Sequence, residues 1–541
     1  MSNRDRLGES LTSLCAGALA LNLVGVMALL VLLGVHGLGY FWQKDLVLVE
    51  LRDGSRQLGE IQDREPIPPG PEVPAGSERI QMKVGNRDLS GADFIWIDEP
   101  EIVERTRPAE AVVLERMEWG NAYGTLVEIR RDENVLAGGP EEARRSFAKI
   151  HPRKLEELEA IRDLEKGAIG EVNYRMERLR LEGRRLEGLD LSREERAERQ
   201  AELDEEIDTL QDRYETLEAR LFAMRKELVA ETAVLETADG QRLEVPVGNV
   251  VRAVWPNSSG LLTTCSVYLS RVWEFVAGQP RESNTEGGIF PAIFGTVMMV
   301  FLMSFAVVPF GVLAALYLRE YARQGPLVRT VRIAVNNLAG VPSIVFGVFG
   351  LGFFVYLVGG TIDRIFYPEA LPTPTYGTGG ILWASLTLAL LTVPVVIVAT
   401  EEGLASVPRI TREGSLALGA TKFETTWRVV IPAAAPGILT GVILAMARAA
   451  GEVAPLMIVG MVKLAPSLPV DHHFPFIHLE RKFMHLGFHI YDVGFQSPNV
   501  DATKPLVFAT ALLLILVVTT MNLVAIGLRN HLRRKYASSA V

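Results

Sequence analysis

Cysteine is nearly absent from this sequence. The 541 residues contain only Cys15 and Cys265, which excludes a disulfide scaffold and any multi-cysteine metal or iron–sulfur site. A basic surplus is also missing, because 55 Lys and Arg stand against 65 Asp and Glu, and this excludes a generic nucleic-acid binder. No Gly-x-x-x-x-Gly-Lys-Ser/Thr loop, catalytic triad or paired-carboxylate motif with supporting context occurs. The chain therefore lacks the usual cradle for ATP, and we predict no catalytic residues.

What the sequence does have is long apolar runs. Apolar residues make up 48% of the chain, and the mean hydropathy is +0.20. A helix that crosses a bilayer needs ~20 consecutive apolar residues. Six stretches qualify, at residues 11–41, 289–318, 333–358, 380–400, 433–462 and 505–528. We predict an all-α polytopic membrane protein with six transmembrane helices, the first of which is retained because no small-residue cleavage site closes it.

The charges give the orientation and divide the chain. With the N-terminus inside, the inner segments carry 14 Lys and Arg and the two short outer loops carry five, so both termini are predicted to be cytoplasmic. Residues 42–288 then face outward. They hold 35 basic and 51 acidic residues, whereas the rest of the chain holds 20 and 14. Two chemically different bodies therefore share one polypeptide.

The outer segment combines short β-like runs with long charged helices. The β-like runs are 46–51, 94–97, 112–114, 125–129 and 245–254, with a turn signal at Asp239-Gly240 and a proline-rich stretch at Pro66, Pro68, Pro69, Pro71 and Pro74. Residues 203–228 carry apolar side chains at alternating steps of four and three, which is a heptad seam. Ser192 and Glu195 form a capping box that begins this second helix. We predict an antiparallel helical hairpin inserted in a small β platform.

A solvated coiled coil without chemistry is the simplest interpretation of the hairpin. Contact with a soluble outer partner is the alternative. The predicted organisation is a transmembrane helix at 1–42, a β-rich segment at 43–140, the hairpin at 141–236, a return β segment at 237–260, a core of five transmembrane helices at 261–535 and a tail at 536–541.

The inner loop at 401–432 has a distinctive pattern. Short amphipathic pieces alternate with Gly or Pro breaks, which predicts a helix, turn, helix element across the membrane face. The spacing of its Glu, Gly-Ala and final Pro resembles the "EAA" coupling loop of bacterial ABC importer permeases. The residues that carry the resemblance are Glu413, Gly419, Ala420 and Pro432, with Gly414 and Ser415 where two alanines are usual. Small residues thus replace small residues, and close packing against a partner stays possible.

Four further segments narrow the resemblance. Residues 287–296, 318–322, 337–347 and 447–456 are similar to the A subunit of phosphate-specific transport (Pst) permeases. The similarity covers roughly residues 262–535 and the first span. It implies a multi-pass protein of the bacterial inner membrane. The resemblance does not explain the outer segment, which we predict to be a large α+β periplasmic insert, enlarged relative to the compact form of that family.

The resemblance also implies partners. These are a sister permease subunit, a cytoplasmic ATP-binding subunit and a periplasmic phosphate-binding protein. No cofactor is expected on this chain, because ATP is bound by the partner subunit. The function implied is that of the permease subunit of an ATP-driven phosphate importer. A permease for another oxyanion, such as sulfate or molybdate, and a membrane-anchored scaffold or sensor are the alternatives.

Polar residues within spans are candidates for the substrate path, because a charge in a bilayer costs ~2.5 to 3.5 kcal/mol on insertion scales. Arg448 and Glu452 lie one turn apart in the fifth predicted span. We predict that Arg448 presents a forked donor to phosphate and that Glu452 positions it, with a purely structural ion pair as the alternative. Asn336 and Asn337, beside a Gly340-Val341-Pro342-Ser343 break, are predicted to offer donors to the same anion or to cap helices.

The last outer loop is rich in histidine. It contains His472, His473, His478, His485 and His489. His485 and His489 are spaced to share a helical face, as zinc ligands do. No carboxylate pattern nearby fixes a coordination geometry, so we predict a loop without a metal.

Overall fold

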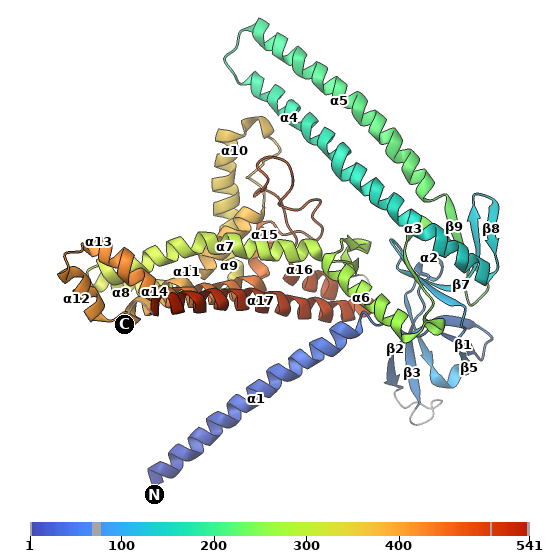
Figure 1. The fold of residues 1–541 in the computed structure, drawn as a ribbon, viewed down its shortest axis with the longest axis horizontal. Coiled ribbons are helices and arrows are strands. Elements are labelled where there is room, and N and C mark those ends of the chain that lie inside the picture. Colours follow the sequence, from blue (N-terminus) through green and yellow to red (C-terminus); the bar gives the residue numbers. More distant parts are fainter. Residues whose placement is uncertain (1–2, 68–76, 498–499, 538–541) are drawn as a thin grey trace.

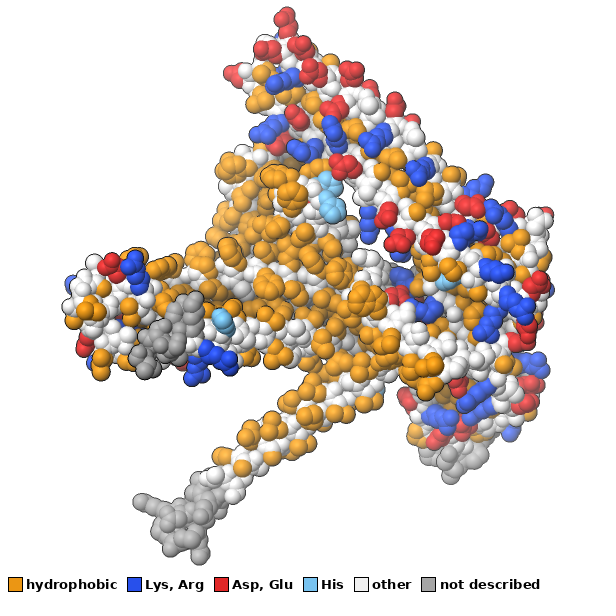
Figure 2. Space-filling view, viewed as in Figure 1, with side chains coloured by type: hydrophobic (Ala, Val, Ile, Leu, Met, Phe, Trp, Pro, Cys, Tyr) orange, Lys and Arg blue, Asp and Glu red, His pale blue; other side chains and the backbone are white. Residues whose placement is uncertain are grey.

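The structure is a computed structural model that describes residues 3–67, 77–497 and 500–537. It contains a helical bundle, two β-sheets beside one end of the bundle, and a long helical hairpin that extends from the sheets (Figure 1). Apolar side chains gather over the bundle and along α1 (Asn3–Gly39), whereas charged side chains cover the hairpin and the sheets (Figure 2). The proline-rich stretch predicted beyond Pro66, and residues 538–541 of the predicted tail, lie outside the described residues.

Six helices among the described residues are long and apolar enough to cross a membrane. They are Thr12–Gly39 within α1, Phe290–Tyr321 including α7 (Phe290–Leu316), Ser343–Phe366 from α9 (Ser343–Phe349) to α10 (Gly360–Phe366), α11 (Ile381–Ser406), Lys422–Gly451 including α13 (Lys422–Thr425) and α14 (Ile431–Gly451), and Thr503–Arg534 within α17 (Val500–Ala537). Each overlaps one of the six predicted stretches. The chain is thus a mostly helical, polytopic membrane protein.

The helix α11 lies at the centre of the bundle, where it packs against α7 and α14. Met299, Leu388 and Ala445 are members of its main apolar core and are fully buried. A β-carbon built on Gly437 of α14 would lie 2.7 Å from the Cα of Gly403 of α11. Glycine on both helices therefore lets the two backbones approach closely, as small residues do in membrane helix packing.

The third apolar helix begins later than predicted. The sequence placed a span at 333–358, but residues 333–338 belong to a separate helix, α8 (Pro326–Leu338), and the apolar helix runs Ser343–Phe366. Pro342 separates the two helices, because proline cannot donate the hydrogen bond that would continue α8. The prediction was wrong at this boundary because the apolar face of α8 extends the hydrophobic run.

The fifth apolar helix is shifted in the same way. It was predicted at 433–462 and lies at Lys422–Gly451. Glu452 follows with extended backbone angles (φ −82°, ψ 130°), and a short helix α15 (Ala454–Val459) begins after it. The apolar composition continues through α15, so hydropathy alone did not reveal the break at Glu452.

The insert, residues 43–260, contains two antiparallel sheets. The five-stranded sheet has the order β4-β3-β2-β1-β5, and the six-stranded sheet has the order β10-β9-β7-β6-β11 with β8 paired to β7. The strands are β1 (Val47–Leu51), β2 (Arg56–Pro66), β3 (Glu78–Lys83), β4 (Phe94–Asp98), β5 (Ile102–Thr106), β6 (Ala111–Arg116), β7 (Asn121–Arg131), β8 (Asn134–Gly138), β9 (Glu231–Glu236), β10 (Arg242–Pro246) and β11 (Val250–Val254). A short helix, α2 (Arg87–Ser90), connects β3 and β4, and a two-stranded pair, β12 (Pro280–Arg281) and β13 (Glu286–Gly287), lies outside the insert.

Several strands differ from the predicted runs. The run at 245–254 was predicted as one strand, but a 3-10 turn at Val247–Asn249 separates β10 from β11. Strands β2, β3, β5, β8 and β9 were not predicted. In β2 the reason is its charge, because Glu60, Asp63 and Arg64 replace the apolar residues that mark a strand face. The predicted turn residue Gly240 lies between β9 and β10 with φ +81°, in the left-handed region.

The hairpin has two long arms. The first consists of α3 (Pro140–Leu164), a π-helical turn at Glu165–Ile169 and α4 (Gly170–Glu187), and the second is α5 (Arg193–Leu228). Glu165 pairs with Arg225 and Arg175 pairs with Glu206, so the arms run antiparallel. Apolar side chains between them form one cluster, which comprises Val172, Met176, Leu179, Leu203, Ile207, Leu210, Tyr214 and Leu217. At 1.5 Å per residue α5 is about 54 Å long.

The two ends of the insert meet. The backbone N–H of Leu46 donates to Oδ1 of Asn257 (3.0 Å), and Nδ2 of Asn257 donates to the carbonyl oxygens of Leu46 (2.8 Å) and Pro108 (2.8 Å). The first strand and the last turn of the insert therefore lie side by side. A helix that was not predicted, α6 (Leu261–Ala277), follows and leads to α7.

Candidate functional site

The loop at 401–432, which is predicted to face the cytoplasm and is called the inner loop below, contains a short helix set between two breaks. After α11 ends at Ser406, Pro408 precedes α12 (Arg409–Ala417). Gly419 has φ +88°, a conformation that favours glycine, and it reverses the chain after α12. Thr421 and Glu424 then form a capping box, with both reciprocal hydrogen bonds, that begins α13. Proline, glycine and a capping box thus produce the helix, turn, helix element.

The predicted coupling residues occupy different environments in this element. Glu413 and Gly414 are exposed on α12, and nothing lies within 4 Å of a β-carbon built on Gly414. The hydroxyl of Ser415 lies 2.9 Å from that of Thr425, which joins α12 to α13. Ala420 is half-buried and donates its N–H to the carbonyl of Ser415 (3.3 Å). Pro432 is in the first turn of α14, where proline is tolerated.

An arginine that sequence reasoning did not single out holds this element in place. Arg412 donates to the carbonyl oxygens of Val407 (2.8 Å) and Leu404 (2.6 Å), which end α11, and to the carboxylate of Glu320 (3.1 Å), which lies at the end of the second span. Both charged partners are largely buried. The available signal was an Arg and a Glu in two loops predicted to lie on the same side of the membrane.

The exposed surface of this helix, turn, helix element is apolar. Ile410 and Leu418 are 82% and 91% exposed, and Phe423 and Trp427 on the following helix are 65% and 57% exposed. The rings of Phe423 and Trp427 stack with centroids 6.1 Å apart. Large apolar side chains grouped on a charged surface mark an interaction surface. We call Ile410, Leu418, Phe423 and Trp427 the apolar coupling patch.

Asn336 and Asn337 lie on α8, at the coupling-loop end of the bundle. Asn336 lines a cavity of about 250 Å³ together with Arg319, Arg332 and Glu401. Nε of Arg332 lies 3.1 Å from Oε1 of Glu401, so α8 is tied to the end of α11. The carbonyl of Asn337 accepts a hydrogen bond from the N–H of Gly340 (3.0 Å), at the break that follows α8.

Arg448 and Glu452 lie at the other end of α14. Arg448 is 17 positions beyond Ile431, the first residue of α14, which is about 26 Å along a helix. Nε of Arg448 lies 3.7 Å from Oε1 of Glu452, and their side chains are 36% and 22% exposed. The structure thus brings Arg448 and Glu452 together, whereas Asn336 lines a separate cavity beside Glu401 of α11.

The face of α14 that carries Arg448 is not covered by the part of the chain that the structure describes. This face contains Leu444, Arg448 and Gly451, which are spaced at helical steps of four and three. Leu444 is 57% exposed, and Gly451 is also exposed. The opposite face, with Ala445 and Ala449, is buried in the main core. A guanidinium on an uncovered helix face can meet either a ligand or a second protein.

The histidines of the loop that is predicted to face outward do not act as one group. His489 is buried on α16 (Leu486–Tyr491), and His485 is buried directly before that helix. Burial lowers the pKa of each to about 4. His473 and His478 instead contact the carboxylate of Asp471. Burial alone would raise the pKa of Asp471, but the N–H of His473 and the Arg481 guanidinium hold it well below its usual range. Within the described residues, no group of three His, Cys, Asp or Glu is arranged to hold a metal ion.

The hairpin contacts this histidine loop, which the sequence did not predict. Nε2 of His473 lies 2.8 Å from Oε2 of Glu171, and the hydroxyl of Tyr174 donates to the carbonyl of Phe474 (3.2 Å). The rings of Tyr174 and His473 lie 4.2 Å apart. Because Glu171 and Tyr174 are one turn apart on α4, one face of that helix lies against the loop.

Residues 307–538 match the family described as "Binding-protein-dependent transport system inner membrane component". The phosphate transport system permease protein PstA 1 of Mycobacterium tuberculosis is 34% identical over 243 residues, which are 45% of this chain and 71% of that protein. The probable ABC transporter permease protein YqgH of Bacillus subtilis is 32% identical over 194 residues, which are 36% of this chain and 59% of that protein.

Among solved structures, an inward-facing form of the MetNI methionine ABC transporter aligns with 44% of this chain and 94% of its own chain, at 19% identity and a TM-score of 0.34. The family match begins within α7 and continues through α17, so it leaves out the insert. With its apolar helices and its similarity to PstA 1, the chain belongs to the binding-protein-dependent transport system inner membrane component family and is a multi-pass transmembrane permease subunit of an ABC importer.

Proposed function

We propose that this chain is the permease subunit of an ATP-driven phosphate importer and forms half of the translocation path. The observation that supports phosphate is the similarity to PstA 1 of Mycobacterium tuberculosis, a phosphate transport system permease protein. The chemistry of Arg448 agrees with it, because an oxyanion that leaves water needs a cation, and a guanidinium offers paired donors to phosphate oxygens. A second permease subunit would cover the exposed face of α14 and complete the path.

A single arginine suits transport better than a cluster. Glu452, 3.7 Å away, competes with the anion for the guanidinium and so weakens binding. Weak binding is required, because a tightly held anion would not leave the path. At the inner end of the path, Asn336 and Arg319 line the cavity beside α8 and would meet the anion as it is released.

Force would reach this path through the inner loop. We place a cytoplasmic ATP-binding subunit against the apolar coupling patch, with Glu413, Gly414, Ser415, Gly419, Ala420 and Pro432 as the coupling residues. Arg412 ties the loop to α11 and to Glu320, so displacement of α12 would move both helices. A periplasmic phosphate-binding protein would deliver the anion at the other end. This arrangement requires the bacterial inner membrane, with both termini in the cytoplasm.

Uptake of radiolabelled phosphate tests the function. Cells that lack this chain, and any homologue that compensates, should take up phosphate only when the chain is restored. Unchanged uptake in the deleted strain would remove the phosphate assignment. Competition by unlabelled sulfate or molybdate at equal concentration distinguishes the second candidate, a permease for another oxyanion, because Arg448 alone does not distinguish these anions. A membrane-anchored scaffold would leave the uptake of all three unchanged.

A further inference from the structure

The helix α6, between the insert and the second span, has an exposed stripe without charge. The residues of the stripe are spaced at helical steps of four and three and are all exposed. They are Leu262, Ser266, Leu269, Trp273 and Ala277. Leu262, Leu269 and Trp273 are 88%, 65% and 72% exposed. A helix that exposes a leucine and tryptophan stripe is only half covered by its own chain.

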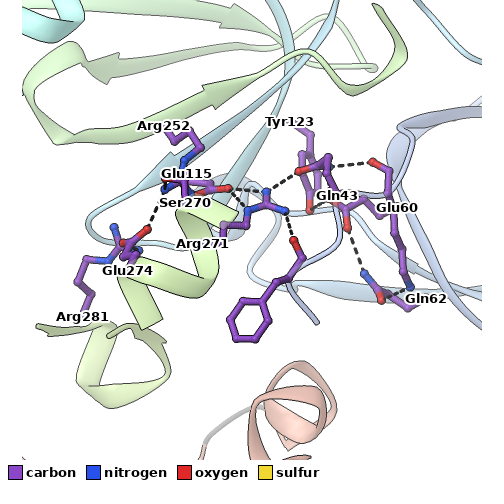
Figure 3. A network of polar contacts seen from close by, with 12 residues as sticks. Gln43, Glu60, Gln62, Glu115, Tyr123, Arg252, Ser270, Arg271, Glu274 and Arg281 are labelled. Carbon is purple, nitrogen blue, oxygen red and sulfur yellow. Dashed lines mark hydrogen bonds and ion pairs between the residues drawn. The ribbon is translucent and has the colours of Figure 1, made fainter. Parts of the chain in front are cut away.

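The charged residues of α6 are held on its other side. Nε of Arg271 donates to the Glu115 carboxylate of β6 (2.7 Å), and Nη1 donates to the carbonyl of Phe41 (3.2 Å) (Figure 3). Glu274 pairs with Arg252 (3.0 Å). Although burial alone would raise the pKa of Glu115, the Arg271 and Arg252 guanidinium groups hold it below its ordinary value. The ion pairs therefore fix which face of α6 points outward.

The stripe lies close to the point where the first span ends. The ring of Tyr268 on α6 packs against Phe41 (centroids 6.3 Å apart) and Trp42 (5.9 Å), which directly follow α1. Along Thr12–Gly39, α1 is apolar and exposed around almost its whole circumference, as expected of a helix surrounded by lipid. Trp and Tyr gather where membrane helices meet water.

We propose that α6 lies in the outer boundary between bilayer and water, with Leu262, Leu269 and Trp273 inserted between the lipids. The helix has 17 residues, about 26 Å, and it carries Arg271 and Glu274, so it is unsuited to cross the membrane. An amphipathic helix of this kind buries its apolar face at the headgroup level. Because Tyr268 packs against Phe41 and Trp42, α6 lies at the level where the first span ends.

This arrangement gives the insert a second support. Arg271 and Glu274 form ion pairs with β6 and β11, and the stripe is inserted in the bilayer. The sheets therefore stay at a fixed height above the membrane. The inference does not depend on the transported substrate.

Spin labels on the stripe test the proposal. In a Cys15→Ser, Cys265→Ser background, single labels at Leu262→Cys and Leu269→Cys are measured in the full chain, purified with its partner subunits and reconstituted in phosphatidylethanolamine and phosphatidylglycerol bilayers. Accessibility to oxygen, which concentrates in lipid, is compared with accessibility to a water-soluble nickel chelate. Phe222→Cys on α5 is the matched control, because Phe222 is 72% exposed, between Leu269 (65%) and Leu262 (88%).

We expect the ratio of oxygen to nickel accessibility to be severalfold higher at 262 and 269 than at 222. High nickel accessibility at 262 and 269 would place the stripe in water and overturn the proposal. Low accessibility to both reagents would also overturn it, in favour of a protein cover such as the sister subunit. Tryptophan fluorescence gives a second readout that needs no label. Lipids brominated near the headgroup should quench the emission of Trp273, so the quenching should be smaller in the Trp273→Phe variant.

Discussion

Nη2 of Arg412 lies 3.1 Å from the carboxylate of Glu320, across 92 positions of the chain. The contact joins the inner loop to the end of the second span, and both side chains are at most one-fifth exposed. The inner loop is therefore attached to the bundle by an ion pair as well as by the chain itself. The coupling role proposed for the loop requires such an attachment, because a flexible connector would absorb the displacement.

We predict that Arg412→Ala uncouples the loop. Its removal takes the guanidinium donor away from the Glu320 carboxylate and from two carbonyl groups, at a cost of ~1.5–3 kcal/mol for a hydrogen bond to a charged group. ATP hydrolysis by the assembled complex should become independent of substrate, and uptake should fall severalfold. Arg409→Ala, at the exposed beginning of α12, is the control and should retain uptake. Full coupling in Arg412→Ala would refute the attachment.

Two glycines of the loop should respond in opposite ways to alanine. Gly419→Ala forces a β-carbon into the left-handed region (φ +88°), which costs ~1–2 kcal/mol. Gly414→Ala adds a methyl group in open space on a helix and should stabilise α12 by up to ~1 kcal/mol. Thermal unfolding of the purified protein measures both changes. Equal effects of the two substitutions would show that the turn at Gly419 tolerates any residue.

Arg448→Ala should abolish uptake while the subunits still copurify, because Arg448 lies on an uncovered face of α14. Arg448→Lys keeps a charge but loses the paired donors, so uptake should be reduced and not lost. Glu452→Gln should slow release, and its uptake should saturate at lower phosphate concentration. Loss of copurification in Arg448→Ala would instead assign the residue to a structural ion pair.

The buried histidines predict a dependence of stability on pH. The folded pKa values of His485 and His489, about 4, lie below the unfolded value near 6.5. The unfolded chain therefore binds protons first, and the free energy of unfolding should fall as the pH drops from about 6.5 toward 4. Between pH 6.5 and 5 most carboxylates are still ionised, so the histidines account for much of the change in stability. The melting temperature of a His489→Gln variant should therefore fall less over this interval than that of the natural protein. An identical fall in both would contradict the assignment.

The contact between the hairpin and the histidine loop can be measured by hydrogen exchange. His473→Ala removes the contact to Glu171 and the ring contact to Tyr174, so amides of residues 461–485 should exchange faster. His472→Ala, in the same loop but exposed, is the matched control and should leave exchange unchanged. Equal exchange in the two variants would indicate that the loop is ordered without the hairpin.

Hydropathy predicted that six membrane helices exist, but it did not predict all of their ends. It failed at residues 333–338 and beyond Glu452, because an amphipathic helix and a short apolar helix each continue the run of apolar residues. The capping boxes at Ser192 and Thr421 are local, so their residues alone define where α5 and α13 begin. The pairs Arg412–Glu320 and His473–Glu171 join distant segments, and such pairings depend on packing that a single sequence does not encode in any local pattern.

Asn257 holds the first strand of the insert beside its last turn through hydrogen bonds to Leu46. The path of the polypeptide through 43–260 thus closes on itself, so the end of α1 is held near the beginning of α6. A hairpin lengthened by whole heptads beyond Tyr174 would keep this closure and also the contact with the histidine loop.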